Sequence, residues 1–441
     1  MQPQAPPHPS DAFGQPRALL IAVQLPDAVE SDVLASLDEL ENLVSGLGYR
    51  VTRRIIQKRA ATSSSVLGSG KLDELSRAIK PSKEDEEVED SAPEVDVAVV
   101  DQELSGGQAR QLEKALGVAV LDRTNVILRV FEERARTREA RLQVELARLN
   151  YEAPRLRDEA VSDARGGGGR GERGHTNVEL GKQRLRERIA ALTRELEAVE
   201  RGRKRERARR RQTQRVALVG YTNAGKSSLM RALTSSAVLV EDKLFATLDT
   251  TVRSLQPERV PRILVSDTVG FMRALPHTLL ASFRSTLDEA NEADLLLNVV
   301  DASDPDIEDK LGVTRGVLTE IGAGSIPCRL VLNKIDRVAP DRRAELEDRF
   351  PGAVTTSAYD PASVAELRDA IEAFFDARMS SAEFELPYAM GKALAELRAN
   401  ARVTSEHYTD TGITVTVQAP PDVLARLRRS YDAFERSSVP G

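Results

Sequence analysis

A glycine-rich loop between an apolar run and a helical pattern limits what this chain can fold into more than any other feature. In VALVGYTNAGKSSLM, residues 216–230, four residues separate Gly220 from Gly225-Lys226-Ser227. Glycines let the backbone turn so tightly that its N–H groups face phosphate oxygens, and the N-terminus of the following helix adds positive potential. The pattern therefore predicts a P-loop.

Each part of this loop has an expected role. Lys226 should reach the β- and γ-phosphates of a nucleotide and act in catalysis, and the Ser227 hydroxyl should ligate magnesium. Asn223 either satisfies a turn or helps to hold a potassium ion, which would add positive charge near the γ-phosphate. The nucleotide-binding residues expected here are Gly220, Tyr221, Thr222, Asn223, Ala224, Gly225, Lys226 and Ser227.

A second motif, ILVSDTVGF at residues 263–271, follows about forty residues later. Its apolar run predicts a strand that carries Asp267 at its C-terminal end, where an acid of a P-loop protein holds magnesium through water. Gly270 is expected to place a backbone N–H on the γ-phosphate and so to act in catalysis. The predicted contacts of this motif are Asp267, Thr268, Val269 and Gly270.

Selectivity for guanine is predicted by RLVLNKID, residues 329–336, in which an apolar strand ends in a polar group. The Asp336 carboxylate can accept hydrogen bonds from N1–H and from the amino group of guanine. Adenine lacks this pair of donors and would leave the acid unpaired, at a cost of about one to several kcal/mol. The predicted base contacts are Asn333, Lys334, Ile335 and Asp336, with the backbone of Ser357 and Ala358 near the guanine oxygen.

Two positions bear on hydrolysis. The segment LFATLDTTVR, residues 244–253, should supply a threonine that binds magnesium; Thr247, Thr250 and Thr251 all qualify chemically, and spacing does not choose among them. Many GTPases place a glutamine directly after the DxxG glycine to orient the attacking water, but this chain has Phe271, whose ring cannot make those bonds. We therefore expect slow GTP hydrolysis by the isolated protein and a partner that completes the site.

Composition and periodicity divide the chain into five segments. Residues 1–16 are expected to be a disordered tail, 17–125 a small α/β domain, 126–213 an antiparallel helical hairpin with a glycine-rich tip, 214–378 the P-loop GTPase domain and 379–441 a small α+β domain. The predicted fold class is α/β, with the P-loop domain preceded by the small α/β domain and the hairpin and followed by the α+β domain.

Three local patterns carry specific expectations. Pro154 and the run RGGGGRGERG at 165–174 are expected to interrupt the hairpin helices, with the helical pattern resuming at Val178. A helix should begin after Ser105, whose hydroxyl can cap it. The GSGK string at 68–71 lacks the spacer of a P-loop and is expected to be a turn or an RNA-facing loop.

Composition favours a reducing compartment. Cys328 is the one cysteine, so no internal disulfide can form, and its apolar surroundings predict a core position. No run of 18 apolar residues occurs, which argues against a membrane span. We expect a cytoplasmic monomer that can associate with the inner membrane surface.

The net charge is −6, yet residues 201–215 hold nine basic residues and one acid, which suits either contact with RNA or a solvated helix face.

Over about residues 17–378 the chain resembles the HflX family of translational GTPases. Beyond the nucleotide motifs, the likeness rests on LGSGKLDEL (67–75), VLDRTNVILRVFEERARTREARLQVELARLNYEAPRL (120–156), FATLD (245–249) and DTVGFMRALPHTLLASFRSTLDE (267–289). The resemblance implies that Thr247 is the switch threonine and second magnesium ligand, and that the switch is lined by Phe245, Ala246, Thr247, Leu248 and Asp249. It also implies a partner, the large ribosomal subunit and its RNA, and a role in splitting or rescuing stalled ribosomes.

Two positions depart from the family pattern. The family commonly reads close to GPGETQLE after its glycine run, where this chain has ERGHTNVE at 172–179, and it often has proline where this chain has Thr250.

Two other functions fit the residues: a GTPase in RNA chaperoning or modification away from the ribosome, and a protein-binding switch whose hairpin is a dimerisation arm. Removal of residues 165–210 would distinguish the RNA-directed functions from the protein-binding switch, because it should abolish RNA-stimulated GTPase activity only in an RNA-directed protein.

Overall fold

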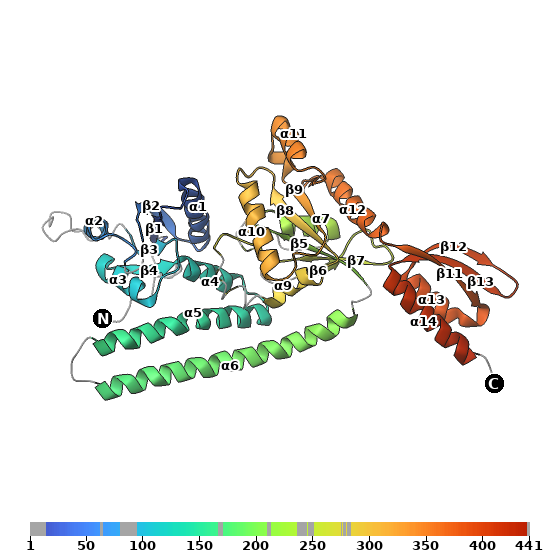
Figure 1. The fold of residues 1–441 in the computed structure, drawn as a ribbon, viewed down its shortest axis with the longest axis horizontal. Helices are drawn as coiled ribbons and strands as arrows, with labels where there is room; N and C mark the ends of the chain where they lie inside the picture. Colours follow the sequence, from blue (N-terminus) through green and yellow to red (C-terminus); the bar gives the residue numbers. More distant parts are fainter. Residues whose placement is uncertain are drawn as a thin grey trace. The chain divides into compact units, whose positions relative to one another are not determined.

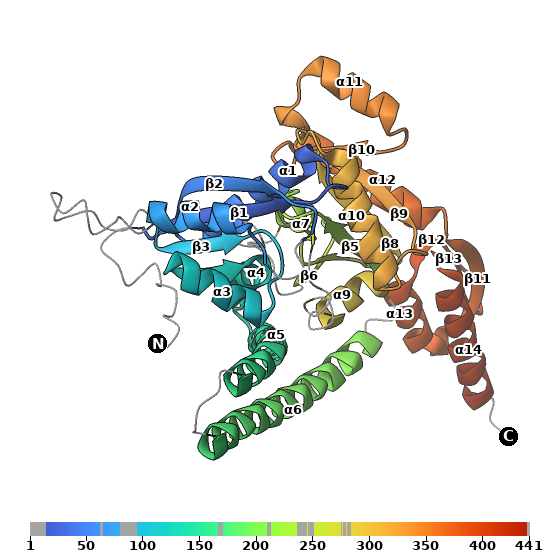
Figure 2. The same cartoon turned by 60° about the vertical axis from the view of Figure 1, so that its left-hand side comes forward.

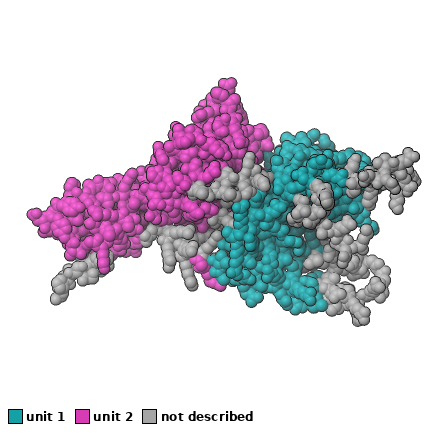
Figure 3. Space-filling model, turned by 180° about the vertical axis from the view of Figure 1, so that it is seen from behind, with its two compact units in different colours: residues 1–199, 243–248, 273–283 teal, residues 200–242, 249–272, 284–441 magenta. Residues whose placement is uncertain are grey.

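The computed structural model describes residues 15–61, 65–79, 95–165, 171–209, 213–235, 245, 251–274, 276, 279 and 284–438. The chain forms two compact units, which Figure 3 shows in different colours. Unit 1 comprises residues 1–199, 243–248 and 273–283, and unit 2 comprises residues 200–242, 249–272 and 284–441. Two short stretches on either side of the DTVG motif therefore belong to unit 1.

Unit 1 is built on a parallel four-stranded sheet with the order β2-β1-β3-β4 (Figure 1). Its strands are β1 (Arg17–Gln24), β2 (Arg50–Lys58), β3 (Val97–Val100) and β4 (Ala119–Asp122), and its helices before the hairpin are α1 (Glu30–Gly46), α2 (Ser69–Ile79), α3 (Gly106–Leu116) and α4 (Arg123–Arg134). Every residue of β3 and β4 is buried. Such continuous burial is typical of parallel strands covered on both faces, and it agrees with the predicted α/β class.

Local signals explain where two of these helices begin. Ser105 caps α3 as expected: its hydroxyl accepts from the Gln108 N–H at 3.2 Å, and its own N–H donates to the Gln108 side-chain oxygen. The GSGK string, expected as a turn or loop, instead opens helix α2 at Ser69. This helix forms because Leu75 and Ile79 lie on one of its faces and are buried in the core of the unit.

Two long antiparallel helices follow, α5 (Arg138–Arg165) and α6 (Gly171–Arg209), and they lie side by side in both Figure 1 and Figure 2. A small apolar cluster of Leu142, Leu192 and Leu196 forms the buried contact between them. Although both helices are long, no described helix is apolar enough over a sufficient length to cross a membrane.

The expected interruption at Pro154 is wrong, because α5 continues through this residue. A proline removes one helical hydrogen bond, and side chains on either side of it hold the helix in place. The Tyr151 hydroxyl donates to Asp122 at 2.6 Å, and the Arg155 guanidinium binds the same carboxylate. The second helix also begins earlier than expected, at Gly171.

Unit 2 contains a six-stranded sheet with the order β10-β9-β8-β5-β7-β6, in which every neighbouring pair is parallel except β6 and β7. Its strands are β5 (Gln214–Gly220), β6 (Thr251–Ser254), β7 (Ile263–Asp267), β8 (Leu295–Asp301), β9 (Cys328–Asn333) and β10 (Val354–Thr355). The helices that follow these strands in the chain are α7 (Lys226–Thr234), α9 (Arg284–Asn291), α10 (Ile307–Glu320), α11 (Pro340–Arg349) and α12 (Pro361–Asp376).

Two cores cover the two faces of this sheet. Val299 and Val331 belong to the core that α7 and α12 complete, whereas Val300 and Leu332 belong to the core that α10 and α11 complete. Successive residues of a strand point to opposite faces, so helices lie on both sides, as the prediction of an α/β domain requires. The core position expected for Cys328 is wrong: this residue begins β9 and is exposed, because only the last three residues of the strand are buried.

The last part of the chain is an antiparallel sheet with the order β11-β13-β12 packed against two helices (Figure 1). The elements are β11 (Ser380–Pro387), α13 (Gly391–Asn400), β12 (Arg402–Tyr408), β13 (Gly412–Ala419) and α14 (Pro421–Ser438). In β11, Ala382, Phe384 and Leu386 are buried while Glu383 and Glu385 are exposed. This alternation is typical of a sheet with one covered face, and it fits the expected α+β arrangement.

Candidate nucleotide-binding site

Four parallel strands of unit 2 end at one edge of its sheet and place polar residues there. β5 ends at Gly220, β7 at Asp267, β8 at Asp301 and β9 at Asn333. Ligands of open α/β sheets bind beyond the carboxyl ends of the strands. The structure therefore brings the glycine loop, the DTVG motif and the NKID motif together at the edge where a ligand is expected.

Two glycines of the loop adopt positive φ angles that other residues rarely take. Gly220 has φ +140°, and a Cβ atom there would lie 2.2 Å from the carbonyl oxygen of Val299. Gly225 has φ +89°, and a Cβ atom there would lie 2.2 Å from Nδ2 of Asn333. Helix α7 begins directly afterwards at Lys226. The loop thus needs both glycines to pass close to β8 and β9 before it enters the helix.

The Lys226 side chain is buried and donates to the loop itself. Its Nζ lies 3.1 Å from the carbonyl oxygen of Gly220 and 2.8 Å from that of Tyr221. Burial lowers the pKa of Lys226 to about 8, although the Asp267 charge acts in the opposite direction. An ammonium group in such surroundings is stabilised by any anion that can reach it, which suits a phosphate.

Ser227 and Asp267 meet beside this lysine. The Ser227 hydroxyl donates to Oδ2 of Asp267 at 2.7 Å, and the Asp267 side chain is buried. The next residue, Thr268, donates its hydroxyl to the carbonyl oxygen of Leu218 at 2.8 Å and so fixes the backbone after β7. A hydroxyl and a carboxylate are oxygen donors of the kind that magnesium prefers.

The end of the DTVG motif lies against the P-loop. The Phe271 N–H donates to the Gly220 carbonyl at 3.1 Å, and the Phe271 carbonyl accepts from the Thr222 N–H at 2.7 Å. A Cβ atom at Gly270 would lie 2.9 Å from Cα of Thr222 and 3.0 Å from Nζ of Lys226, so this approach requires glycine. The Phe271 ring is buried, so this side chain packs in the core.

The NKID motif is tied to the P-loop by two side chains. Asn333 Nδ2 donates to the Ala224 carbonyl at 2.8 Å, and Lys334 Nζ donates to the Asn223 carbonyl at 2.7 Å. Lys334 has a left-handed backbone, φ +60°, and starts the short helical turn that carries Asp336. Asp336 is exposed at this edge of the sheet.

The loop after β10 lies next to this motif. The Ile335 N–H donates to the Thr356 carbonyl at 3.2 Å, and the Ser357 N–H donates to the Ser363 hydroxyl at 3.0 Å. Ala358 packs against the main core of the unit. The predicted pair Ser357-Ala358 is therefore held beside the NKID turn by bonds to that turn and to α12.

Asp301 and Lys310 also belong to this edge, although no motif pointed to them. The Asp301 carboxylate lies 2.8 Å from Nζ of Lys334, and the Lys310 ammonium lies 5.3 Å from the centroid of the Tyr221 ring. A signal for Asp301 was present in the sequence, since it follows the apolar run LLLNVV as Asp267 follows ILVS.

Of the predicted switch residues 245–249, the structure describes only Phe245, which belongs to unit 1. Its ring packs edge-on against the ring of Phe131, with the centroids 4.6 Å apart. The other predicted switch residues, Ala246, Thr247, Leu248 and Asp249, lie outside the described residues, as does Thr250.

Comparison with known proteins assigns the chain to a family. Three family models match: GTP-binding GTPase N-terminal at residues 34–132, GTP-binding GTPase Middle Region at 134–210 and 50S ribosome-binding GTPase at 215–334. GTPase HflX of Gluconacetobacter diazotrophicus is 52% identical, covering 95% of this chain and 98% of its own length, and GTPase HflX of Caldanaerobacter subterraneus is 38% identical, covering 93% of each. A solved structure of the SsGBP and GDP complex is 25% identical and covers 82% of this chain and 98% of its own, with a TM-score of 0.43. The family models and the two relatives show that the chain belongs to the HflX family of GTPases, which hydrolyse GTP.

Proposed function

We propose that this GTPase acts on the large ribosomal subunit and splits or rescues stalled ribosomes in a cycle driven by GTP. The observation that carries the proposal is the match of residues 215–334 to the 50S ribosome-binding GTPase model, in a region whose P-loop, DTVG and NKID motifs converge at one sheet edge. We expect the protein to work in the cytoplasm as a monomer.

The P-loop would hold the phosphates, with Lys226 on the β- and γ-phosphates and the Gly270 N–H on the γ-phosphate. Ser227 and Thr247 would ligate magnesium directly, and Asp267 would hold it through water. The contact between Ser227 and Asp267 supports this assignment, because both contribute oxygen atoms that suit a small hard cation. A magnesium ion held by these residues would supply positive charge against the negative charge that develops on the phosphates during hydrolysis.

The guanine base would lie against the NKID turn, with Asp336 accepting from N1–H and the amino group. Support comes from the exposed position of Asp336 and from the bonds that fix Asn333 and Lys334 to the P-loop. Ile335 and the backbone of Ser357 and Ala358 would complete the base contacts.

Hydrolysis would depend on the ribosome, because the Phe271 side chain is buried and has no polar atom to orient water. We also propose a potassium ion near Asn223, which has a left-handed backbone within the loop, φ +59°. The GTPase rate should then be higher in potassium than in sodium buffers, and equal rates would remove this ion from the proposal.

The RNA-facing element would be the hairpin, because the basic run of residues 201–215 begins within α6, which ends at Arg209. Arginine and lysine side chains bind RNA phosphates without reading sequence. A protein without residues 165–210 should retain GDP binding and lose stimulation by large subunits. Equal stimulation by free RNA and by subunits would favour a role in RNA chaperoning or modification instead.

Sedimentation with isolated large subunits tests the central proposal. Wild-type protein with a non-hydrolysable GTP analogue should pellet with the subunits much more than protein with GDP, because the γ-phosphate orders the switch segments. Lys226→Ala is the matched control and should pellet equally with both nucleotides. Equal pelleting of the wild-type protein with GTP analogue and GDP contradicts the proposed cycle.

A further inference from the structure

A carboxylate that belongs to none of the three nucleotide motifs contacts the NKID lysine. Asp301 is the last residue of β8, and its backbone is paired with Asn333 at the end of β9. Its Oδ2 lies 2.8 Å from Nζ of Lys334, and both side chains are largely buried, with exposed fractions of 19% for Asp301 and 14% for Lys334. The pair therefore lies across the ends of two neighbouring strands.

The Asp301 carboxylate is itself held in a fixed orientation. Its other oxygen, Oδ1, accepts from the Ser303 N–H at 2.9 Å and from the Ser303 hydroxyl at 2.6 Å. The Ala302 N–H between them donates to the Asn333 carbonyl at 2.7 Å. Burial alone would raise the pKa of Asp301, but the bonds from Lys334 and Ser303 lower it below its usual value, so the carboxylate is charged at neutral pH.

Lys334 is thus fixed at its far end by two acceptors. Its ammonium donates to the Asn223 carbonyl at 2.7 Å and contacts Asp301, while its backbone leads directly into the turn that carries Asp336. A lysine two residues from a carboxylate can neutralise it. Because the Lys334 ammonium pairs with Asp301, it does not pair with the exposed Asp336 carboxylate, which can then accept hydrogen bonds from a ligand. The same contact fixes the position of the apolar stem of Lys334.

We propose that Asp301 is a positioning residue for guanine-nucleotide binding, which acts by fixing the Lys334 side chain between β8 and the P-loop. This inference rests on the proposed placement of the guanine base beside Lys334 and Asp336. Since GDP and GTP carry the same base, Asp301 should contribute equally to the binding of both and should not affect the chemical step.

Two single variants, Asp301→Asn and Lys334→Met, test this role together with the double variant that combines them and with one control variant. Asp301→Asn should raise the Kd of GDP and of a GTP analogue by about tenfold each, the loss expected when one charged hydrogen bond to a positioned lysine is removed. Its KM for GTP should rise in parallel, with kcat at saturating GTP, measured with large subunits, within about twofold of wild type. Lys334→Met should weaken binding by at least as much.

The double variant separates positioning from general stabilisation. If Asp301 acts through Lys334, adding Asp301→Asn to Lys334→Met should change the Kd of GDP by less than about twofold. The inference is overturned if the increase in the Kd of GDP in the double variant equals the product of the increases in the two single variants. It is also overturned if Asp301→Asn alone leaves this Kd unchanged. An unchanged Kd in Lys334→Met alone overturns instead the proposed base site on which the inference rests.

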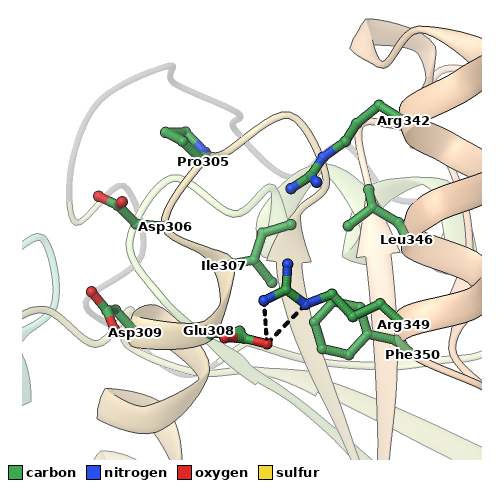
Figure 4. A pocket seen from close by; sticks show the side chains of 9 residues that line it. All are labelled: Pro305, Asp306, Ile307, Glu308, Asp309, Arg342, Leu346, Arg349 and Phe350. Carbon is green, nitrogen blue, oxygen red and sulfur yellow. Dashed lines mark hydrogen bonds and ion pairs between the residues drawn. The ribbon is translucent and has the colours of Figure 1, made fainter.

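Glu308→Gln provides the matched control, because it also converts an acid to its amide near the start of α10. Glu308 pairs with Arg349 of α11 at 2.7 Å, in the pocket that Figure 4 shows, and 61% of its side chain is exposed. This variant should bind GDP as the wild type does. Thermal unfolding of the nucleotide-free variants should show whether Asp301→Asn remains folded at the assay temperature, and circular dichroism at that temperature confirms that Kd values refer to folded protein.

Discussion

Lys226 is expected to make nucleotide binding depend on pH, because its side chain is buried. Its ammonium donates to two carbonyl groups of the P-loop, and burial lowers its pKa to about 8 in the nucleotide-free protein. Phosphate oxygens favour the charged ammonium, so the nucleotide-bound protein retains this proton to higher pH. If Lys226 contacts the phosphates as proposed, nucleotide binding above pH 8 should take up a proton.

The size of the effect follows from the same pKa. With a value of about 8, the charged fraction of Lys226 falls from about nine tenths at pH 7 to about one tenth at pH 9. The affinity for GDP should fall by about tenfold over this range, or about 1.4 kcal/mol. The stability of the nucleotide-free protein should change with pH in the opposite direction. The pKa of Lys226 is lowered from 10.5 in the folded protein, so the unfolded chain binds more protons between pH 8 and 10.5. The contribution of Lys226 to the free energy of unfolding therefore rises with pH in this range.

Calorimetric titration with GDP in two buffers of different ionisation enthalpy measures this proton uptake. We expect about 0.9 protons per GDP at pH 9 and about 0.1 at pH 7. Lys226→Arg is the control, because its guanidinium stays charged throughout and ionisation of the nucleotide itself affects both proteins alike. The same pH dependence of GDP affinity in the two proteins would refute the role given to the buried ammonium.

Three further substitutions test other parts of the structure. Gly225→Ala should abolish measurable GDP binding in a fluorescence titration, because its Cβ would lie 2.2 Å from Nδ2 of Asn333; retained affinity would contradict the close approach. Asp336→Asn should weaken GDP binding by about a hundredfold, because a charged acceptor of two hydrogen bonds is lost. This variant should bind xanthosine diphosphate better than GDP. Leu192→Ala should destabilise the hairpin by about 2–5 kcal/mol, seen as faster hydrogen exchange in α5 and α6, while leaving the Kd of GDP unchanged; unchanged exchange would mean that the buried leucine cluster does not hold the helices together.

Local patterns predicted most of the elements because their causes lie within a few residues. The Ser105 cap acts through the backbone of the next turn, and the apolar runs before Asp267 and Asn333 act through strand periodicity. The wrong expectation at Pro154 has a cause that is distant in the chain. Helix α5 passes through Pro154 because residues beside the proline bind Asp122, which lies about thirty residues earlier.

The candidate site divides in the same way. The order of the three motifs, together with the family resemblance, was enough to expect a GTPase, because strands that run parallel bring their carboxyl ends to one edge. The pairing of Phe271 with Gly220 and Thr222 carried no signal in the sequence, since it depends on how the chain after β7 returns to the P-loop.

The amino-acid sequence by itself determined the kind of ligand to expect and the elements that carry the predicted contacts, since the glycine loop and the strand that ends in NKID are each encoded in a stretch of about eight residues. Only the tertiary structure decided which side chains meet across those stretches. Asp301 faces Lys334 because β8 and β9 are neighbours in one particular register, and strand order and register arise from packing of the whole sheet rather than from any segment alone.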